Sequence, residues 1–599
     1  MNIKLKILID DKSYSSYTYH DAISFKQYTV PNTLDPLELK LFSGDIFNYD
    51  ADTGIIELSH SSIRTSKYLA GVIIMNKTFG RQSTTKTATK TATKTATKNP
   101  NNSKLLYRCI PDDKRLPDFL IPVAIKDTKF EKLNINTYII FTFQEWTQKH
   151  PIGQIKQTIG DVNVLVNYFE YQLYCKNLNI SLKEFNDRTH EILRESTKVD
   201  YIDEIMSRYK NIESRLDDDI FTIDPQSSQD YDDALSIQVI NQDDNIIKVS
   251  VYISNVAILI DYFNLWNSFS ERVATIYLPD RRRPMLPVNL SENLCSLKAN
   301  MERMAICMDL YFENNILTKT TYKNVLIKVK KNYVYDEDDL LKNDAYNLLL
   351  NETKKNCRTH KYMSNIKNSH DIVAYYMIFM NHEISKMMAS YKNGIYRSVV
   401  EGTRLITIPA NLPEEIAKFL KIYHSMSGQY SDYENRTSHT YISNGLDIYL
   451  HITSPIRRLV DLLNLIKFQE NLGEIELSRE SCKFYDIWIS RLEYINTTMR
   501  SIKRVQNDCT LLYMCINDPE LIDKQFEGYV FDKIVKNDGL FQYNVYIPEL
   551  KIMSKITIQE TLEDYSNNKF KLFIFSDENN IKKKIRLKIG DISPMTPFF

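Results

Sequence analysis

The sequence predicts a multidomain α+β protein in which small β-barrels flank a central mixed α/β region. Three observations lead to this prediction. The chain has 599 residues, which is too long for one hydrophobic core. Short segments of alternating apolar residues, typical of strands, fill both ends of the chain. Long segments with helical periodicity concentrate in the middle, notably at residues 372–388 and 454–471.

Two strand-rich units open the chain, a small barrel over residues 1–65 and a second unit over residues 66–160. Their predicted strands lie at 3–9, 39–47, 54–58, 68–75, 105–111, 118–124 and 137–143. The second unit contains an insert, residues 82–103, that repeats Thr-Ala-Thr-Lys. Because this insert has no large apolar residue, we expect a disordered loop.

Helical spacing returns at residues 168–194 and predicts a helical linker over 161–200. The large central region, 201–518, starts with strand patterns and continues with long helical ones. The last unit, 519–599, is strand-rich again, with candidate strands at 525–531, 542–548, 571–575 and 584–589.

Composition describes an ordinary globular protein, with 43% hydrophobic and 25% charged residues. No apolar run approaches the roughly 18 residues that span a membrane, and the first residues lack the features of a signal peptide, so we expect a cytoplasmic protein. The eight cysteines are scattered singly, which favours a reducing compartment over a zinc ribbon or disulfide framework. With 76 basic and 76 acidic residues, any nucleic-acid surface has to be a local basic channel.

Four carboxylates crowd into ten residues: Asp224, Asp230, Asp232 and Asp233. They lie between an apolar run that ends at Ile223 and an alternating segment at 234–240, which places them at a strand end and in the turn after it. Acids packed this closely repel one another unless a cation joins them. Divalent cations such as Mg²⁺ prefer all-oxygen sites. The alternative is a polar surface turn, because Asp, Ser and Gln are common turn residues.

A second candidate lies at Ser454-Pro455-Ile-Arg-Arg458. Ser454 followed by Pro455 is typical of a helix N-cap with proline at the first helical position. Arg457 then falls in the first turn of a helix, where an anion is favoured and a guanidinium can bind a phosphate with two hydrogen bonds. The alternative is a structural salt bridge.

These stretches belong to a set of four motifs, in order along residues 222–458. The motifs are Thr222-Ile-Asp-Pro with Asp230-Tyr-Asp-Asp-Ala-Leu, Tyr277-Leu-Pro with Pro284-Met-Leu-Pro, Leu294-Cys-Ser-Leu, and Thr453-Ser-Pro-Ile-Arg-Arg458. Together they resemble the RNB family of exoribonucleases, which includes ribonuclease II, ribonuclease R and the exosome-associated nuclease. With less specificity, residues 151–161 resemble the segment that follows the cold-shock domains in the eukaryotic branch, and residues 526–588 resemble the family's C-terminal OB fold.

The resemblance implies a fold and an activity. The fold is two N-terminal OB-type, cold-shock-like barrels (1–65 and 66–160), a central mixed α/β RNB catalytic domain (201–518) and a C-terminal OB-fold barrel (519–599). The activity is hydrolysis of single-stranded RNA from 3′ to 5′ into nucleoside 5′-monophosphates, with Mg²⁺ as cofactor and Mn²⁺ as an alternative. A monomer is expected. The family's N-terminal endonuclease domain, and association with the exosome, are not expected.

The resemblance also assigns roles to residues. The four aspartates hold the metal ions, with Asp232 closest to the attacking water. Arg457 neutralises charge on the phosphate undergoing attack, and Arg458 joins it in binding substrate. Tyr277 and Tyr335 stack on bases near the 3′ end, although core packing is the alternative for both.

Several positions depart from the family pattern. Asn255 replaces an aspartate, and Ala374-Tyr375-Tyr376 stands where an acid near the last sugar is expected. The other departures are Leu459 for tyrosine, Asn464-Leu465 for His-Arg, and Val505 or a neighbour for an acid. None removes a proposed metal ligand. They leave two alternatives open: a catalytically impaired RNA-binding protein with the same fold, and a nuclease that acts on DNA.

Overall fold

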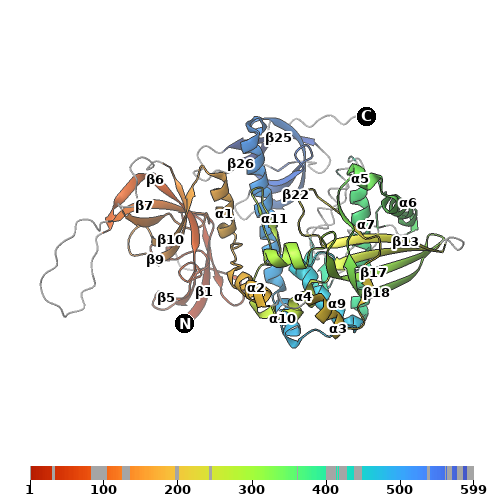
Figure 1. Cartoon of the computed structure of the whole chain (residues 1–599). Coiled ribbons are helices and arrows are strands. Elements are labelled where there is room, and N and C mark those ends of the chain that lie inside the picture. Colours follow the sequence, from red (N-terminus) through yellow and green to blue (C-terminus); the bar gives the residue numbers. More distant parts are fainter. Residues whose placement is uncertain are drawn as a thin grey trace. The chain divides into compact units, whose positions relative to one another are not determined.

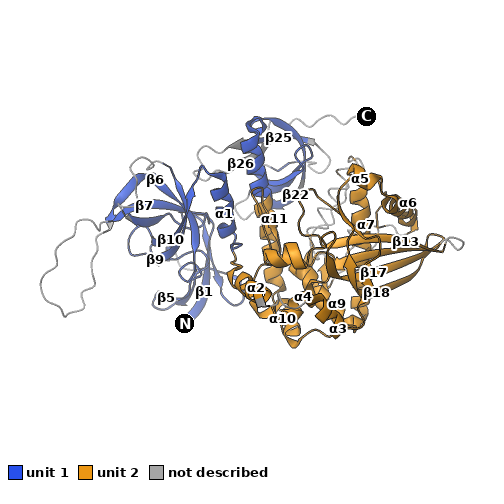
Figure 2. Ribbon diagram, in the orientation of Figure 1, with its two compact units in different colours: residues 1–179, 507–599 blue, residues 180–506 orange. Residues whose placement is uncertain are grey.

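The chain divides into two compact units, residues 1–179 with 507–599 (unit 1) and residues 180–506 (unit 2), which Figure 2 distinguishes by colour. The computed structural model describes all residues except 1, 30–33, 83–103, 125–134, 196–200, 242–245, 360–361, 364, 399–412, 414–415, 417–427, 437–447, 536–539, 560, 563–568, 577–584 and 590–599. The predicted disordered loop at 82–103 therefore lies, apart from Gln82, outside the described residues.

The N-terminal part of unit 1 is made of two sheets (Figure 1). One has the strand order β3-β2-β1-β4-β5, and the other is a closed barrel with the order β10-β8-β7-β6-β9. The strands are β1 (Asn2–Ile9), β2 (Tyr17–Asp21), β3 (Gln27–Tyr28), β4 (Ile46–Asp50), β5 (Ile56–His60), β6 (Leu69–Gln82), β7 (Lys104–Pro111), β8 (Phe119–Ala124), β9 (Thr137–Glu145) and β10 (Ile152–Asp161). Helix α1 (Leu165–Cys175) follows.

The two sheets share one hydrophobic core. Phe42, in the connection between β3 and β4, stacks on Phe119 of β8 with ring centroids 6.1 Å apart, and packs against Trp146 at 4.7 Å. The first sheet does not close into the expected barrel within the described residues. Its edge strand β3 has only two residues, and the opposite edge strand β5 is almost entirely exposed. Closure is therefore confirmed only for the second unit.

The C-terminal part of unit 1 is a five-stranded antiparallel sheet with the order β24-β23-β22-β25-β26. Its strands are β22 (Gln525–Val535), β23 (Phe541–Ile547), β24 (Ile552–Ile558), β25 (Lys569–Ser576) and β26 (Ile585–Ile589). Phe526, Tyr543 and Leu572 are fully buried between these strands. The strand-rich character predicted for this end of the chain is confirmed.

Unit 2 is built on a seven-stranded mixed sheet with the order β11-β18-β17-β14-β13-β12-β19. Its strands are β11 (Glu213–Arg215), β12 (Phe221–Asp224), β13 (Asp233–Asn241), β14 (Ile246–Ser254), β17 (Glu302–Glu313), β18 (Ile316–Lys328) and β19 (Lys331–Val334). The pairs β11–β18 and β12–β19 are parallel, and the others are antiparallel. Strand β17 is buried along nearly its whole length, as expected for a central strand covered on both faces.

Helices and two short ribbons complete unit 2. The helices are α2 (Lys183–Glu195), α3 (Tyr201–Arg208), α4 (Val256–Tyr262), α5 (Asp338–Leu341), α6 (Asp344–Thr359), α7 (Ser369–Ser390), α9 (Leu459–Leu472), α10 (Arg479–Ile489) and α11 (Leu492–Asn517), the last of which crosses the unit boundary. The ribbons pair β15 (Ile276–Tyr277) with β16 (Arg282–Arg283), and β20 (Ile395–Ser398) with β21 (Gln429–Asp432). Within the described ranges, no helix is both long and apolar enough to cross a membrane.

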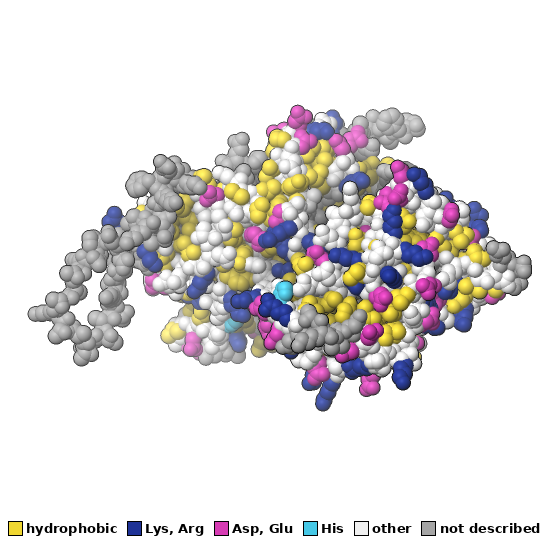
Figure 3. Space-filling view, in the orientation of Figure 1, with side chains coloured by type: hydrophobic (Ala, Val, Ile, Leu, Met, Phe, Trp, Pro, Cys, Tyr) yellow, Lys and Arg dark blue, Asp and Glu magenta, His cyan; other side chains and the backbone are white. Residues whose placement is uncertain are grey.

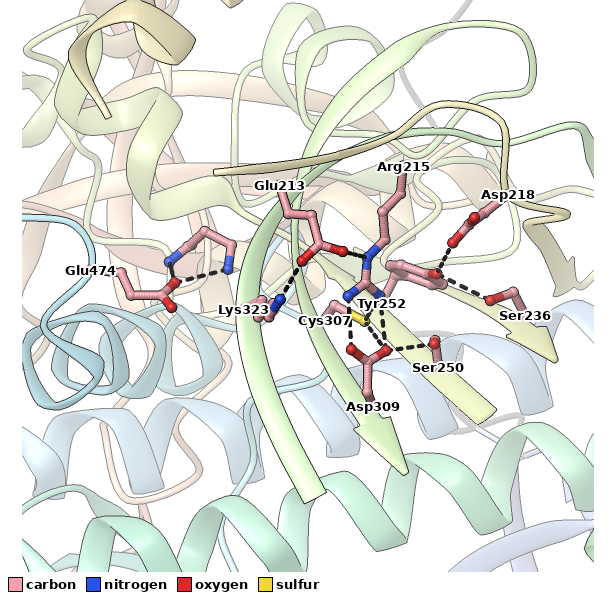
Figure 4. A network of polar contacts seen from close by, with 11 residues as sticks. Glu213, Arg215, Asp218, Ser236, Ser250, Tyr252, Cys307, Asp309, Lys323 and Glu474 are labelled. Atoms are coloured by element: carbon pink, nitrogen blue, oxygen red, sulfur yellow. Dashed lines mark hydrogen bonds and ion pairs between the residues drawn. The ribbon is translucent and has the colours of Figure 1, made fainter. Parts of the chain in front are cut away.

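A buried ion-pair network ties three strands of this sheet together (Figure 4). Arg215 of β11 donates two hydrogen bonds to Asp309 of β17, at 2.8 and 2.7 Å, and Ser250 of β14 donates a third at 2.6 Å. Burial favours a neutral Asp309, but these donors outweigh it and hold the pKa of the carboxyl below its usual value. Because β14 pairs with β13, the network supports the strand on which Asp233 lies.

Candidate active site

The four aspartates lie where β12 and β13 separate. Asp224 is the last residue of β12, and Asp233 is the first of β13. The two strands pair only at Phe221 and Leu235, so the chain between them is released into a turn that carries Asp230 and Asp232. The structure therefore confirms the predicted position of the acids at a strand end and the following turn.

Burial is the dominant influence on three of these acids. The side chain of Asp232 is 2% exposed, and burial raises its pKa to about 8 although Arg457 acts in the opposite direction. Burial and the nearby charge of Asp233 raise the pKa of Asp224. Burial also raises the pKa of Asp233, again against the effect of Arg457. Such shifts, in acids that face one another, are typical of functional sites.

Two buried carboxylate oxygens of this group have no hydrogen-bond partner, Oδ2 of Asp224 and Oδ2 of Asp232. A buried acceptor without a partner is costly, and a bound cation would remove that cost. The donor set of carboxylates alone suits a hard divalent cation. The aspartates therefore fit the expected magnesium chemically. They are not drawn together, since no three His, Cys, Asp or Glu side chains of the described residues lie in a metal-binding arrangement.

Asp230 is engaged through both of its carboxylate oxygens by two side chains of the β15–β16 ribbon. Arg282 of β16 donates to Oδ1 of Asp230 at 2.5 Å, and the hydroxyl of Tyr277 donates to Oδ2 at 3.3 Å. Arg282 also donates to Gln229 at 2.9 Å and forms an ion pair with Glu292. Sequence reasoning missed Arg282. The only signal for it was the basic run at residues 281–283, inside the second motif.

Arg457 and Asp232 are brought together by a turn. Nε of Arg457 lies 3.1 Å from Oδ2 of Asp232, an ion pair without hydrogen-bond geometry, and the Ile456 amide donates to Oδ1 of the same carboxylate at 2.9 Å. The Arg457 side chain stays 46% exposed, so it can reach a ligand from the solvent side. Arg458 is held differently, donating to buried Asp461 at 2.9 Å.

The prediction that Ser454-Pro455 begins a helix is wrong. Helix α9 begins at Leu459, and its N-cap is Arg458, which is extended and makes no capping hydrogen bond through its side chain. The reason is a long-range pairing. Arg458 forms an isolated β-bridge with Ala274, and the neighbouring Thr275 amide donates to the carbonyl of Arg457. This pairing stops the helix, so residues 455–457 form a separate turn over Asp232.

The two predicted tyrosines both border the acids, in different settings. Tyr277 is 41% exposed and bonded to Asp230. Tyr335 follows β19, and its amide donates to the carbonyl of Asp224 at 3.1 Å. Its ring stacks on His370, at the start of α7, with centroids 3.5 Å apart and planes at 7°. One face of Tyr335 is thus covered by a residue that sequence reasoning missed, and which lacks any local signal.

The polar residues that depart from the family pattern are buried, and most of their polar atoms have hydrogen-bond partners. Asn255 caps α4 by accepting from the Ile258 amide, and its own amide donates to Asn324 at 2.9 Å. Asn464 bonds the backbone of Ile395 in both directions. Tyr375 is the exception, since its fully buried hydroxyl has no hydrogen-bond partner. These residues act as packing elements around the site.

Charge on the visible surface of unit 2 is mixed. Basic, acidic and hydrophobic side chains alternate over the face shown in Figure 3, as the formal net charge of zero suggests. On the described residues of that face, no broad basic patch stands out. The positive charge that matters for the acids is local, from Arg457 and Arg282.

Comparison with known proteins identifies the central region. The family model described as RNB domain matches residues 213–374. DIS3-like exonuclease 2 of Schizosaccharomyces pombe is 28% identical over 244 residues, which cover 38% of this chain and 25% of the relative. Ribonuclease R of Ureaplasma parvum is 27% identical over 226 residues, which cover 37% of this chain and 29% of the relative. The matches thus span about a quarter to a third of these relatives' length. Residues 213–374 thus match the RNB domain, which confirms the family resemblance seen in the motifs.

Solved structures extend the likeness of fold beyond this domain. Ribonuclease R of Mycoplasma genitalium, in complex with ribose-methylated single-stranded RNA, has a TM-score of 0.66 at 15% identity, covering 98% of this chain and all of that one. Yeast Ssd1, described as a pseudonuclease, has a TM-score of 0.57 at 12% identity, and the match covers 97% of this chain and 84% of Ssd1. A nuclease and a pseudonuclease therefore share this fold, so the fold alone does not decide activity.

Proposed function

We propose that this protein is a magnesium-dependent exoribonuclease that hydrolyses single-stranded RNA from its 3′ end into nucleoside 5′-monophosphates. One observation carries the proposal. In the region that matches the RNB domain, all four family aspartates are present, at the facing ends of β12 and β13 and in the segment between them, beside Arg457. Two of their buried oxygens accept no hydrogen bond.

Asp224, Asp230, Asp232 and Asp233 would hold the magnesium, with Mn²⁺ as a substitute. When bound, the metal supplies Lewis-acid stabilisation of the phosphate and lowers the pKa of the attacking water. The raised pKa of Asp232 supports this role, because it reflects a negative charge that lacks adequate compensation in the protein alone.

Arg457 stabilises charge on the phosphate. Its guanidinium is held near Asp232 by the ion pair and by a hydrogen bond to Ser454 at 3.2 Å, yet the side chain remains nearly half exposed. A guanidinium fixed at its base and open at its tip can donate to a phosphate oxygen while Asp232 keeps it aligned. Arg458, bound to Asp461, contributes positive charge beside it.

Tyr277 and Tyr335 provide surfaces for the terminal bases. Stacking is independent of base identity, which suits an enzyme that removes every nucleotide in turn. Because His370 covers one face of Tyr335, a base would stack on the other face. We further propose that the sheets at 1–65, 66–160 and 519–599 are OB-type domains that guide single-stranded RNA toward the RNB domain at 201–518, with the linker at 161–200 between them. The proposed location is the cytoplasm, as a monomer.

A second candidate function is RNA binding without hydrolysis. The specific observation in its favour is Tyr375, which replaces an acid expected near the last sugar and is buried among Tyr362, Tyr376 and Phe379. A group buried in this way cannot contact ribose. Loss of that contact would also weaken discrimination between RNA and DNA.

The test incubates purified protein and Mg²⁺ with 5′-labelled single-stranded RNA and with a DNA of the same sequence. The proposal expects RNA to shorten progressively and Asp232→Asn to abolish shortening, with RNA affinity retained. Intact RNA with tight binding in every divalent cation tried would instead establish the binding protein. Preferential cleavage of DNA would contradict the ribonuclease assignment.

A further inference from the structure

Arg282 is the counter-ion of Asp230 in the candidate active site. Its guanidinium reaches Asp230 at 2.5 Å, Gln229 at 2.9 Å and Glu292, and its side chain is 20% exposed. Asp230 is itself only 9% exposed, and its second oxygen accepts from Tyr277. Both oxygens of Asp230 therefore accept hydrogen bonds from the protein, whereas Asp224 and Asp232 each keep one buried oxygen that accepts none.

The β15–β16 ribbon explains why Tyr277 and Arg282 act on the same acid. The two residues are register partners in an antiparallel pair, so their side chains project from the same face of the ribbon. Tyr277 is also the residue that the proposed function assigns to a base of the substrate. A nucleotide that stacks on Tyr277 would therefore bring its phosphates near Arg282.

We propose that Arg282 is a positioning residue that couples metal binding to RNA binding. Without RNA, Arg282 pairs with Asp230 and so occupies an oxygen that a divalent cation would need. With RNA, a phosphate takes over the guanidinium and Asp230 is released to complete the acid set. This inference rests on the proposed function, since it assumes that the acids take a divalent cation and that the substrate carries phosphates.

Arg282 and a divalent cation both bind Asp230 by charge, so either weakens the other. A phosphate offers a guanidinium the same paired acceptors as a carboxylate, so the exchange conserves charge-assisted hydrogen bonds. By linkage, RNA must then raise metal affinity by the same factor by which metal raises RNA affinity.

The experiment measures Mn²⁺ affinity of the full chain by electron paramagnetic resonance of free Mn²⁺. Titrations are run with and without a ribose-methylated single-stranded RNA, and the Mn²⁺ bound by RNA alone is subtracted. Gel analysis verifies that the RNA is intact at the end. The variants are Arg282→Gln, Glu292→Gln and the matched control Arg281→Gln, whose side chain is 67% exposed and whose guanidinium lies 3.8 Å from Asp280.

For the unchanged protein and for Arg281→Gln, RNA should raise Mn²⁺ affinity by about 5- to 150-fold. Without RNA, Arg282→Gln should already bind Mn²⁺ as tightly as the unchanged protein does with RNA. Adding RNA should then raise its Mn²⁺ affinity only a little. Glu292→Gln should bind Mn²⁺ more weakly without RNA, because Arg282 loses a competing acceptor. A gain in affinity is a result that misfolding does not produce.

The inference is overturned if Arg282→Gln and the unchanged protein have the same Mn²⁺ affinity in both conditions. It is also overturned if RNA raises the affinity of Arg282→Gln as much as that of the unchanged protein. If no form binds Mn²⁺ even with RNA, the proposed metal-dependent function fails as well. The two failures are thus distinguishable.

Discussion

Replacing Asp232 with asparagine should stabilise the metal-free protein, and the gain should grow with pH. The carboxylate is 2% exposed, and burial raises its pKa to about 8, whereas an unfolded chain has an ordinary aspartate. Between these two pKa values the folded state binds more protons than the unfolded state. The free energy of unfolding therefore falls as pH rises through this window. Asparagine keeps an acceptor for the Ile456 amide and removes the titration.

The magnitude follows from the pKa shift. Each pH unit inside the window costs about 1.4 kcal/mol of stability. Between pH 5 and pH 8, the advantage of Asp232→Asn over the unchanged protein should therefore grow by about 4 kcal/mol. Asp224 and Asp233 are present in both proteins, but the charge of Asp232 also contributes to the raised pKa of Asp224. The difference between the two proteins therefore reports Asp232 together with its effect on that neighbour.

The assay is urea unfolding in EDTA at several pH values, followed by tryptophan fluorescence. Asp219→Asn is the control, since that acid is half exposed and lies 3.4 Å from Lys330 at the surface. It measures what the loss of one surface carboxylate does under the same conditions. An Asp232→Asn variant whose stability relative to the unchanged protein is equal at pH 5 and pH 8 would show that Arg457 and the Ile456 amide fully compensate this buried carboxylate.

Three further predictions follow from the same contacts. Arg457→Lys should lower kcat by about a hundredfold with a small change in RNA affinity, because a single ammonium replaces the fork that faces the phosphate; unchanged single-turnover rates would contradict this role. Tyr335→Ala should weaken RNA binding by about 1–3 kcal/mol, whereas Tyr335→Phe should not, as measured by fluorescence anisotropy; equal affinities would exclude stacking. Arg215→Met should destabilise unit 2 by about 3–5 kcal/mol in urea, because it leaves Asp309 buried and unpaired, and a loss below about 1 kcal/mol would show that the network is dispensable.

The position of the acids could be read from the sequence because the signals are local. Pro225 ends one strand, and the alternation after Asp233 begins the next, so both the strand end and the turn were predictable. Their chemical meaning was not local. It depended on motifs more than forty residues away, which the family resemblance joined. The match to the RNB domain over residues 213–374 confirms the resemblance, and the roles of the acids stay a prediction.

The errors and omissions come from contacts between distant residues. The Ser454-Pro455 signal was a sound local indication of a helix start, but a bridge to Ala274 held Arg458 extended. The stacking of Tyr335 on His370 and the bond from Arg282 to Asp230 join residues 35 and 52 positions apart. No periodicity or capping rule reports such pairs, because side-chain direction depends on how the sheet and helices pack.

The products formed from one RNA that is labelled at its 3′ end or at its 5′ end test most directly whether the protein is a 3′-to-5′ exoribonuclease. The same single-stranded oligomer is labelled at its 3′ or 5′ end and incubated with the full chain and Mg²⁺. The account predicts that 3′ label appears at once as a nucleoside 5′-monophosphate, while 5′ label remains in steadily shortening products. Asp232→Asn should leave both labels in the intact oligomer. Intact RNA with the unchanged protein, or early release of the 5′ label, would contradict the account.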